Sequence, residues 1–265
     1  RSPASSALSS GSRTVRSMDF VKMHGAGNDF IVVYRADLPP DASPSDAIAL
    51  CDRHTGIGAD GVLVVSPNPP SMEVWNADGT VAEMCGNGLR CVVRRLEQDG
   101  LWHPGATVIT GAGAVSAELV GDEVKVGIAV PRLLDREPVE VDGVQGHRVD
   151  LGNPHFVVFT NDDLMSFGPR LESHARFPHR TNVGQGTVQD DGSLRLRVWE
   201  RGVGETRACG SGACAAAVVA AHTGRTTGDV IDVWLPGGRL RVHSPPDEGQ
   251  AVHLQGPAVT VFRGH

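Results

Sequence analysis

Apolar and polar residues alternate in short segments along most of the chain, and Gly and Pro separate these segments. A period of two residues is typical of β-strands that bury one face. Four other stretches predict helices, at 46–54, 88–97, 164–175 and 212–222. Strands are predicted at 20–23, 30–34, 62–65, 72–76, 107–109, 113–119, 124–130 and 194–199, with a strand pair within 149–160 and short strands between 230 and 262.

The stretch 200–224 reads ERGVGETRACGSGACAAAVVAAHTG and joins a glycine-rich loop to an alanine-rich segment. Ala is the best helix former and Gly224 stands where a helix stop is expected, so 212–222 is predicted to be a buried helix. Cys209 then lies at the N-terminus of that helix, where free N–H groups and the helix dipole favour a thiolate. The alternative is an inert, buried cysteine in a Gly/Ala turn.

The same pattern occurs twice in the chain. Residues 74–96 read VWNADGTVAEMCGNGLRCVVRRL and residues 198–220 read VWERGVGETRACGSGACAAAVVA. The segment 27–33 is echoed by 152–158 at an offset of 125 positions (152 − 27). Ordered matches at a nearly constant offset predict a duplication of units of roughly 120 residues, and therefore two related domains. The pairs that lie 124 positions apart (209 − 85) are Trp75 and Trp199, Asn76 and Glu200, Cys85 and Cys209, and Gly88 and Gly212.

Composition narrows the class of protein. Hydrophobic residues make up 40% and charged residues 21%, as in globular proteins, and no apolar run reaches the length of a membrane helix. The net charge of −7 argues against nucleic acid as a partner. Five cysteines, an odd number, predict free thiols in a reducing compartment, and their spacing does not predict a metal site. We therefore expect a cytoplasmic protein with a small-molecule partner.

Residues 1–17 carry seven serines, three arginines and no acidic residue. We interpret them as a disordered arm that comes from a tag or a misassigned start, and we leave them out of the fold. A transit peptide has the same composition, so a plastid location would follow only if these residues belong to one.

Two cysteines at facing helix N-termini suggest a specific chemistry. A thiolate on one side and a thiol on the other can remove a proton from one face of a carbon and return one to the opposite face. The N–H groups of both helices would hold a carboxylate between them. The pattern therefore predicts racemisation or epimerisation next to a carboxylate. Lys22 and Lys125 lie in strand-like segments without a phosphate loop, so we expect no pyridoxal phosphate and no other cofactor.

Three further segments allow two interpretations each. Asn28, in the loop 24–29, is either a ligand-facing amide or a turn residue that bonds to its own backbone. His155 is either a turn residue or part of the site. The glycines of 56–61 do not form a phosphate loop, because no Gly-Lys-Ser/Thr follows and the order is helix, loop, strand.

From Met18 to about Gly264 the chain resembles the diaminopimelate epimerase family. The segments that carry this resemblance are KMHGAGNDF (22–30), DRHTGIGADG (52–61), NADGTVAEMCGNG (76–88), GNPHF (152–156), ESHARFPHRTNVG (172–184), ERGVGETRACGSGACAA (200–216) and LPGGRL (235–240). The resemblance implies an α/β (α+β) fold of two pseudo-symmetric domains, each a mixed sheet curled around a central helix, with the site in a cleft between them. It implies domains at 18–130 and 131–256, with a C-terminal strand, 257–265, that returns to the first.

The resemblance also implies the reaction, the interconversion of LL- and meso-diaminopimelate in lysine and peptidoglycan precursor synthesis without a cofactor. Cys85 and Cys209 would be the acid and base. The backbone of Gly86, Asn87, Gly210 and Ser211 would hold the reacting carboxylate. Asn28, Asn76, Asn153 and Asn182 would bind the amino and carboxylate groups, with Glu200 and Arg201 at the distal end of the substrate. Members of the family often carry Gln where this chain has Gly61, and a homodimer is expected.

Two alternatives remain open at this point. A proline-type racemase uses two thiols but needs no distal acidic and basic pair, and this chain has both Glu200 and Arg201. A non-catalytic or redox-sensing amino-acid-binding protein would have structural cysteines or a reversible disulfide, and alkylation of the thiols would then leave ligand binding unchanged.

Overall fold

The computed structural model describes residues 18–244 and 249–265, so the arm predicted for 1–17 lies outside the described residues. The helices are α1 (Asp46–Cys51), α2 (Gly86–Gln98), α3 (Gly168–Glu172) and α4 (Gly210–His222), with 3₁₀ turns η1 (Arg35–Asp37) and η2 (Leu164–Ser166). The strands are β1 (Phe20–Gly25), β2 (Asn28–Tyr34), β3 (Gly61–Pro67), β4 (Pro70–Asn76), β5 (Val81–Ala82), β6 (Thr107–Thr110), β7 (Gly113–Val120), β8 (Glu123–Ala129), β9 (Arg132–Leu133), β10 (Val139–Val141), β11 (Val144–Asp150), β12 (Pro154–Phe159), β13 (Asn182–Val188), β14 (Leu194–Glu200), β15 (Gly204–Thr206), β16 (Val230–Leu235), β17 (Gly238–His243), β18 (Val252–Pro257) and β19 (Val259–Gly264).

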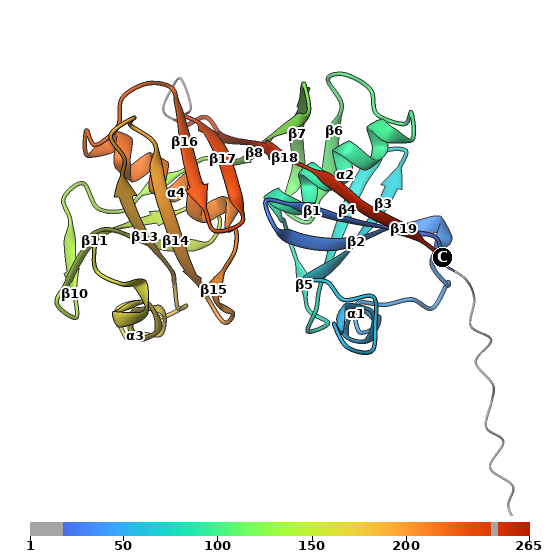
Figure 1. The fold of residues 1–265 in the computed structure, drawn as a ribbon, viewed down its shortest axis with the longest axis horizontal. Coiled ribbons are helices and arrows are strands. Elements are labelled where there is room, and N and C mark those ends of the chain that lie inside the picture. Colours follow the sequence, from blue (N-terminus) through green and yellow to red (C-terminus); the bar gives the residue numbers. More distant parts are fainter. Residues whose placement is uncertain (1–17, 245–248) are drawn as a thin grey trace, which may run out of the picture.

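The first half of the chain curls its sheet around α2. Neighbouring strands pair in the order β19, β1, β2, β3, β4, β6, β7, β8 and β18, with β2 parallel to β3 and β4 parallel to β6. The strands β18 and β19 follow one another along the chain and cross from one half to the other, as Figure 1 shows. Their pairing with β8 and β1 therefore closes the sheet.

The second half repeats this arrangement around α4. Its strands pair in the order β8, β18, β17, β16, β14, β13, β12, β11 and β9, and β9 follows directly on β8. The first half is thus completed by β18 and β19 from the end of the sequence, and the second half by β8 from the first half. The α/β fold of two pseudo-symmetric, curled sheets that the sequence predicted is confirmed, and the residue limits proposed for the two domains stay a prediction.

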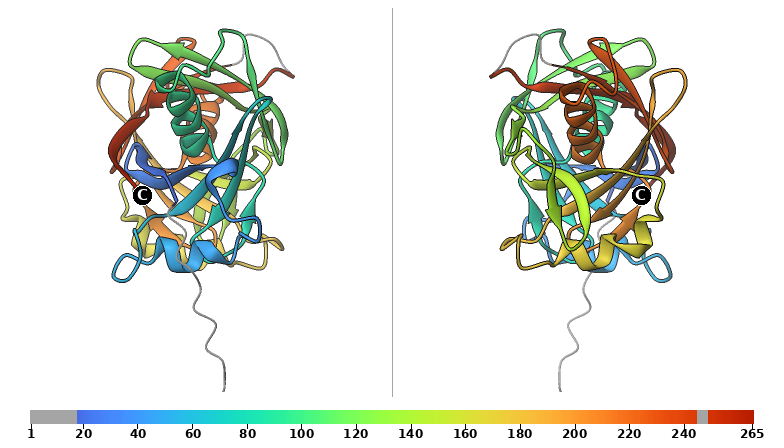
Figure 2. Two further views of the ribbon diagram at one scale, coloured as in Figure 1. Left: turned by 90° about the vertical axis from the view of Figure 1, so that its right-hand side faces the viewer. Right: turned by 90° about the vertical axis from the view of Figure 1, so that its left-hand side faces the viewer.

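Strands surround the two central helices, as the side views in Figure 2 show, and α4 is buried along most of its length, whereas the last turn of α2 exposes Glu97 and Gln98. The helix α4 buries a run of small residues, from Ala213 to Ala217, because a helix inside a closed sheet cannot have a polar face. Both helices begin two residues before the predicted positions. Cys85 and Cys209 have extended backbones (ψ 110° and 107°) and are the N-cap residues, so the helices begin at the next residue.

Three other predictions need correction. The helix expected at 46–54 ends at Cys51, because Asp52 is extended and its side chain accepts from the amides of His54 and Thr55. The helix expected at 164–175 is a 3₁₀ turn followed by α3, with a break at Phe167. The strand β13 was not predicted, because its sequence NVGQGTV lacks a regular alternation and contains two glycines.

The two halves also meet at a pair of turns. Gly237, in the turn between β16 and β17, donates its N–H to the Arg207 carbonyl at 2.7 Å. A Cβ at Gly237 would lie 1.8 Å from the carbonyl oxygen of Ala26, in the turn between β1 and β2. This contact is between two backbones, so no side-chain movement can relieve it.

We therefore expect Gly237→Ala to destabilise the protein by roughly 1–3 kcal/mol through overpacking. Urea unfolding followed by circular dichroism measures this change. The control is Gly184→Ala, whose Cβ would lie at an ordinary 3.6 Å from the Leu196 side chain. Equal stability of the two variants would show that the turns are not in contact.

Candidate active site

The structure brings the N-termini of α2 and α4 together. Asn87, in the first turn of α2, donates its side-chain N–H to the carbonyl of Ala208 at 3.1 Å, directly before α4. A Cβ at Gly86 would come within 2.8 Å of the half-buried Ile128 side chain, and a Cβ at Gly210 within 2.8 Å of the buried Leu254 side chain. The glycines that follow both N-cap cysteines therefore allow the helix starts to pack against the sheets and against each other.

The first thiol belongs to a network around Asn28. The Cys85 sulfur accepts from the amide of Gly88 at 3.4 Å and lies 4.0 Å from the side-chain oxygen of Asn28. That oxygen also accepts from Asn87 Nδ2 at 3.2 Å. The Asn28 amide nitrogen donates to Asp60 at 2.7 Å, which fixes the orientation of the amide. Asn28 thus lies beside the thiol rather than capping its own turn.

The second thiol has a matching network in the other half. Asn153 donates to the Ser211 hydroxyl at 3.3 Å, and that hydroxyl lies 3.7 Å from the Cys209 sulfur. His155 is buried, and its Nε2 lies 3.0 Å from Asn153 Oδ1. Burial lowers the pKa of His155 to about 3, so its imidazole is neutral at physiological pH. His155 therefore orients Asn153 from behind the site.

The side chains of Glu200 and Arg201 have different neighbours. The Glu200 carboxylate accepts a hydrogen bond from the Thr206 hydroxyl and lies near the Cys209 thiol. Arg201 is exposed, and its guanidinium donates to the His179 carbonyl at 3.1 Å. Its backbone N–H donates to Asn182 Oδ1 at 2.9 Å. Glu200 therefore lies next to a thiol, whereas Arg201 and Asn182 form a separate group.

Asn76 also bonds elsewhere, and Gly61 has no side chain to contribute to the site. Asn76, at the end of β4, donates to the Thr80 hydroxyl at 2.9 Å within its own turn. Gly61 is buried at the start of β3, and a Cβ there would lie 2.8 Å from the backbone oxygen of Trp75. Gly61 can thus offer only its backbone. The binding roles predicted for Asn76 and the other side chains stay predictions.

Burial and one nearby carboxylate dominate the electrostatics of the thiols. Burial raises the pKa of Cys85, the Gly88 amide opposes this, Glu200 raises the pKa further, and Arg90 lowers it. Burial and the adjacent Glu200 raise the pKa of Cys209 well above its ordinary value. Burial also raises the pKa of Glu200 itself.

Sequence reasoning missed Asp60 and Arg90. Asp60 lies in the GADG segment, where only the glycines were considered, and it accepts from both Asn28 and the amide of Asp29. Arg90 is a charged residue between the apolar positions Leu89 and Cys91, and all three are fully buried. A charge inside an otherwise buried helix was the signal that could have identified it.

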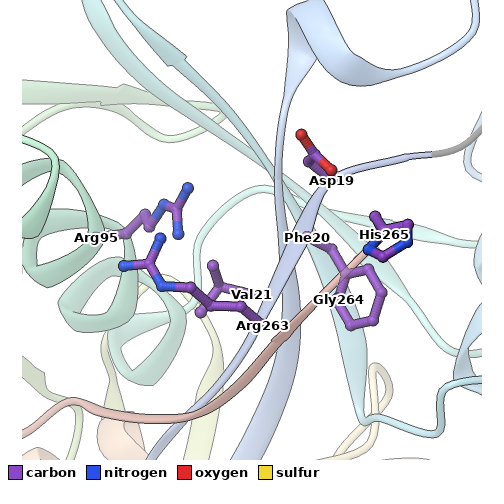
Figure 3. Close-up of a pocket in the computed structure, with 7 residues that line it drawn as sticks. All are labelled: Asp19, Phe20, Val21, Arg95, Arg263, Gly264 and His265. Atoms are coloured by element: carbon purple, nitrogen blue, oxygen red, sulfur yellow. The ribbon is translucent and has the colours of Figure 1, made fainter.

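Surface pockets lie away from the thiols. A pocket of about 340 Å³ is formed by β1, α2 and β19, and Figure 3 shows Arg95 and Arg263 pointing toward each other in it. A pocket of about 270 Å³ lies beside Trp234.

Among the described residues, no group of three or more His, Cys, Asp and Glu side chains could hold a metal ion. No helix in the described ranges is long and apolar enough to cross a membrane.

Comparisons with known proteins agree on one family. A family model for diaminopimelate epimerase matches residues 20–133 and 148–261. The chain is 40% identical over 278 residues to the diaminopimelate epimerase of Pelotomaculum thermopropionicum, and 42% identical over 277 residues to that of Moorella thermoacetica. Each alignment covers 93% of this chain and 98% of the relative.

Solved structures show the same fold at low sequence identity. A phenazine biosynthesis protein of the PhzF family from Bacillus anthracis superposes with a TM-score of 0.71 at 15% identity, over 93% of this chain and 98% of that one. A hydroxyproline epimerase from Agrobacterium vitis superposes with a TM-score of 0.67 at 16% identity, over 95% of this chain and 92% of that one. At such identities the likeness shows the fold alone.

The carboxylate of Asp29, which follows Asn28 in the chain, gives a prediction for the stability of the protein. Asp29 forms ion pairs with Lys22 at 2.5 Å and with Arg53 at 2.7 Å. Burial works to raise the pKa of Asp29, but the bonds from Arg53 and Lys22 outweigh it and lower the pKa to about 2. A depressed folded-state pKa stabilises the protein above the ordinary value of 3.8, and this contribution is lost as the pH falls through 2.

We expect Asp29→Asn to lower the free energy of unfolding at pH 6, and we expect its difference from the unmodified protein to shrink below about pH 4. Urea unfolding at a series of pH values measures this. Asp37→Asn, at an exposed carboxylate without an ion pair to any described residue, is the control. A difference for Asp29→Asn that is constant between pH 6 and pH 3 would contradict the assignment.

Proposed function

The chain belongs to the diaminopimelate epimerase family, and from this premise we propose how its residues carry out the reaction. The protein is an isomerase that interconverts LL-2,6-diaminopimelate and meso-diaminopimelate, a step of lysine and peptidoglycan precursor synthesis. The family match decides against the proline-type racemase and the non-catalytic binding protein that the sequence left open.

The observation that carries the mechanism is the presence of two N-cap thiols at helix starts that touch. We propose that one cysteine, as the thiolate, takes the α-proton of the substrate, so that the C–H bond breaks and an S–H bond forms. The other cysteine, as the thiol, gives its proton to the opposite face of the same carbon. Each turnover thus exchanges the protonation states of Cys85 and Cys209, and no other reactant is needed.

The helix starts would also stabilise the charge that develops. Removal of the α-proton moves negative charge onto the substrate carboxylate. The backbone N–H groups of Gly86, Asn87, Gly210 and Ser211 lie in the first turns of α2 and α4, where N–H groups have no partner inside the helix. We propose that they hold this carboxylate, as the amides of an oxyanion hole do.

The amide side chains would position the rest of the substrate. Asn28 and Asn153 lie beside the two thiols, and we propose that they bind groups of the reacting centre. Glu200 lies next to Cys209, so it is suited to hold a substrate ammonium group near that thiol. Arg201 can grip the distal carboxylate through two parallel hydrogen bonds. Asn76 and Asn182 would complete the distal part of the site.

Deuterium exchange tests this mechanism. Reduced protein incubated with LL-diaminopimelate in D₂O should incorporate deuterium at the α-carbon and produce the meso isomer. We expect Cys85→Ala and Cys209→Ala each to lower the epimerisation rate by roughly 100- to 10,000-fold, since each removes an acid/base group. Cys214→Ala, which removes a buried thiol from α4, should retain most activity. Full epimerisation by either catalytic variant would refute the two-thiol mechanism.

We further propose that the protein is a cytoplasmic homodimer. Free thiols suit a reducing compartment, and all five cysteines are free in the structure. Among the described residues, β19 pairs only with β1, so its other edge offers unpaired N–H and C=O groups. Val259, Val261 and Phe262 of β19 are exposed, and Phe262 packs edge-on against Phe20 with ring centroids 6.0 Å apart. A second copy could cover this apolar edge through a two-fold contact.

Phe262→Asp should therefore shift the sedimentation coefficient from that of a dimer to that of a monomer, because it places a charge in the proposed contact. Met165→Asp is the matched control, since Met165 is an exposed apolar residue on η2, away from β19. A monomeric unmodified protein at micromolar concentration, or a dimeric Phe262→Asp variant, would rule out this interface.

A further inference from the structure

Two charged residues break the symmetry between the halves. Arg90 corresponds to Cys214, and Glu200 corresponds to Asn76, both at the offset of 124 positions (214 − 90 and 200 − 76). For each charged residue, the corresponding residue in the other half of the chain is therefore neutral. The two charges have opposite signs, and Glu200 acts on both thiols, most directly on Cys209.

Arg90 places a positive charge beneath the first turn of α2. It is fully buried, and its guanidinium donates to the Gly86 carbonyl at 3.4 Å, to Asn87 Oδ1 at 2.9 Å and to the Pro257 carbonyl at 3.3 Å. Within the described part of the chain, no carboxylate forms an ion pair with it. A buried cation at a helix N-terminus is unfavourable unless a negative charge lies close by. Cys85, the N-cap of the same helix, can supply that charge as a thiolate.

Glu200 places a negative charge beside the other thiol. It forms no ion pair with any described residue, it accepts from the Thr206 hydroxyl, and it lies near the Cys209 thiol. A carboxyl group ordinarily titrates near ~4.3 and a thiol near ~8.5, so the proton in this contact stays on sulfur. The carboxylate of Glu200 therefore opposes ionisation of Cys209.

The remaining groups around the thiols are neutral dipoles or are already paired. The Gly88 amide favours a Cys85 thiolate, whereas the Asn28 oxygen favours the thiol. The Ser211 hydroxyl can donate to Cys209. Near Arg90, the thiols of Cys91 and Cys214 are buried, and Glu123 of β8 accepts from Gln255 at 2.6 Å and from Arg239 at 3.3 Å. At Cys85 the Gly88 amide affects the pKa more than Arg90 or Glu200, which act in opposite directions, whereas at Cys209 the Glu200 carboxylate is the largest influence after burial.

We propose that Arg90 and Glu200 make the two thiols unequal, so that Cys85 loses its proton to solvent first and Cys209 keeps its proton in the free enzyme. This inference rests on the proposed pairing of these thiols as acid and base. Arg90 acts as a positioning residue, because it fixes Asn87 and the start of α2 and supplies charge without touching the substrate. The free enzyme is thus ready for the epimer whose α-hydrogen faces Cys85.

The inequality of the thiols also determines the protonation state in which the enzyme is left after one reaction. After that epimer has reacted, Cys85 holds the substrate proton and Cys209 is the thiolate beside Glu200. This form is the less stable one, so a proton must leave Cys85 and another must reach Cys209 before the favoured form returns. The opposite epimer begins from the less stable form.

Alkylation of the free enzyme tests the inference without any turnover. The reduced protein is treated with iodoacetamide between pH 5 and pH 11, and mass spectrometry follows the peptides of Cys85 and Cys209 separately. The pH at half the limiting rate reports the pKa of each thiol, whatever its exposure. We expect the midpoint of Cys85 to lie at least about one pH unit below that of Cys209, which corresponds to a tenfold larger thiolate fraction.

Three variants assign the cause. Arg90→Met should raise the midpoint of Cys85 and leave that of Cys209 nearly unchanged, whereas Arg90→Lys, which keeps the charge, should restore most of the shift. Glu200→Gln should lower the midpoint of Cys209. The matched control is Arg94→Met, which removes a charge from the same helix at a residue that pairs with Glu97. Circular dichroism confirms that each variant is folded.

Equal midpoints in the unmodified protein, or a lower midpoint for Cys209, would overturn the inference. So would a folded Arg90→Met variant whose Cys85 midpoint does not move. Neither result would bear on whether the enzyme epimerises diaminopimelate, because deuterium exchange decides that separately.

Discussion

The structure depends on one contact, the approach of two helix N-termini that start at cysteines. Asn87 reaches from the first turn of α2 to the carbonyl in front of α4, and Leu254 packs against the glycine that follows Cys209. Two positive helix ends repel each other, so the contact needs both a scaffold that enforces it and a negative charge that makes it favourable. The exchanged strands are the scaffold, and a thiolate or a substrate carboxylate supplies the charge.

Much of this arrangement could be predicted because the chain contains its pattern twice. The nearly constant offset identified both cysteines and both helices, and the family resemblance supplied the binding residues expected around them. The prediction failed where the local sequence does not determine which distant residue or strand a segment contacts. Nothing around Asp60 indicates that it binds Asn28, which is 32 residues away, and the glycines of β13 hide a central strand. The helix starts were predicted two residues too late because Gly86, Asn87, Gly210 and Ser211 are weak helix formers and resemble loop residues in sequence.

The departures from the repeat are as informative as the repeat itself. A symmetric pair of half-sites would give two thiols of equal acidity and no preferred direction. Arg90 and Glu200 have no charged counterpart in the other half, and both are held without an ion-pair partner among the described residues. A reaction that inverts a carbon needs two faces that are alike in geometry. The protonation states of the two faces must differ, and these two charges separate them.

The crossing strands also determine when the protein can become complete during its synthesis. Phe20, near the start of the described chain, pairs with Gly264, near its end, through β1 and β19. The sheet around α2 therefore stays open until the last strand has left the ribosome, although its other strands are made much earlier. Until then the edge of β1 and the apolar face toward α2 are exposed, which favours aggregation. Closure of the first half thus cannot precede the synthesis of β19, so the integrity of the site at the start of α2 depends on a strand made much later.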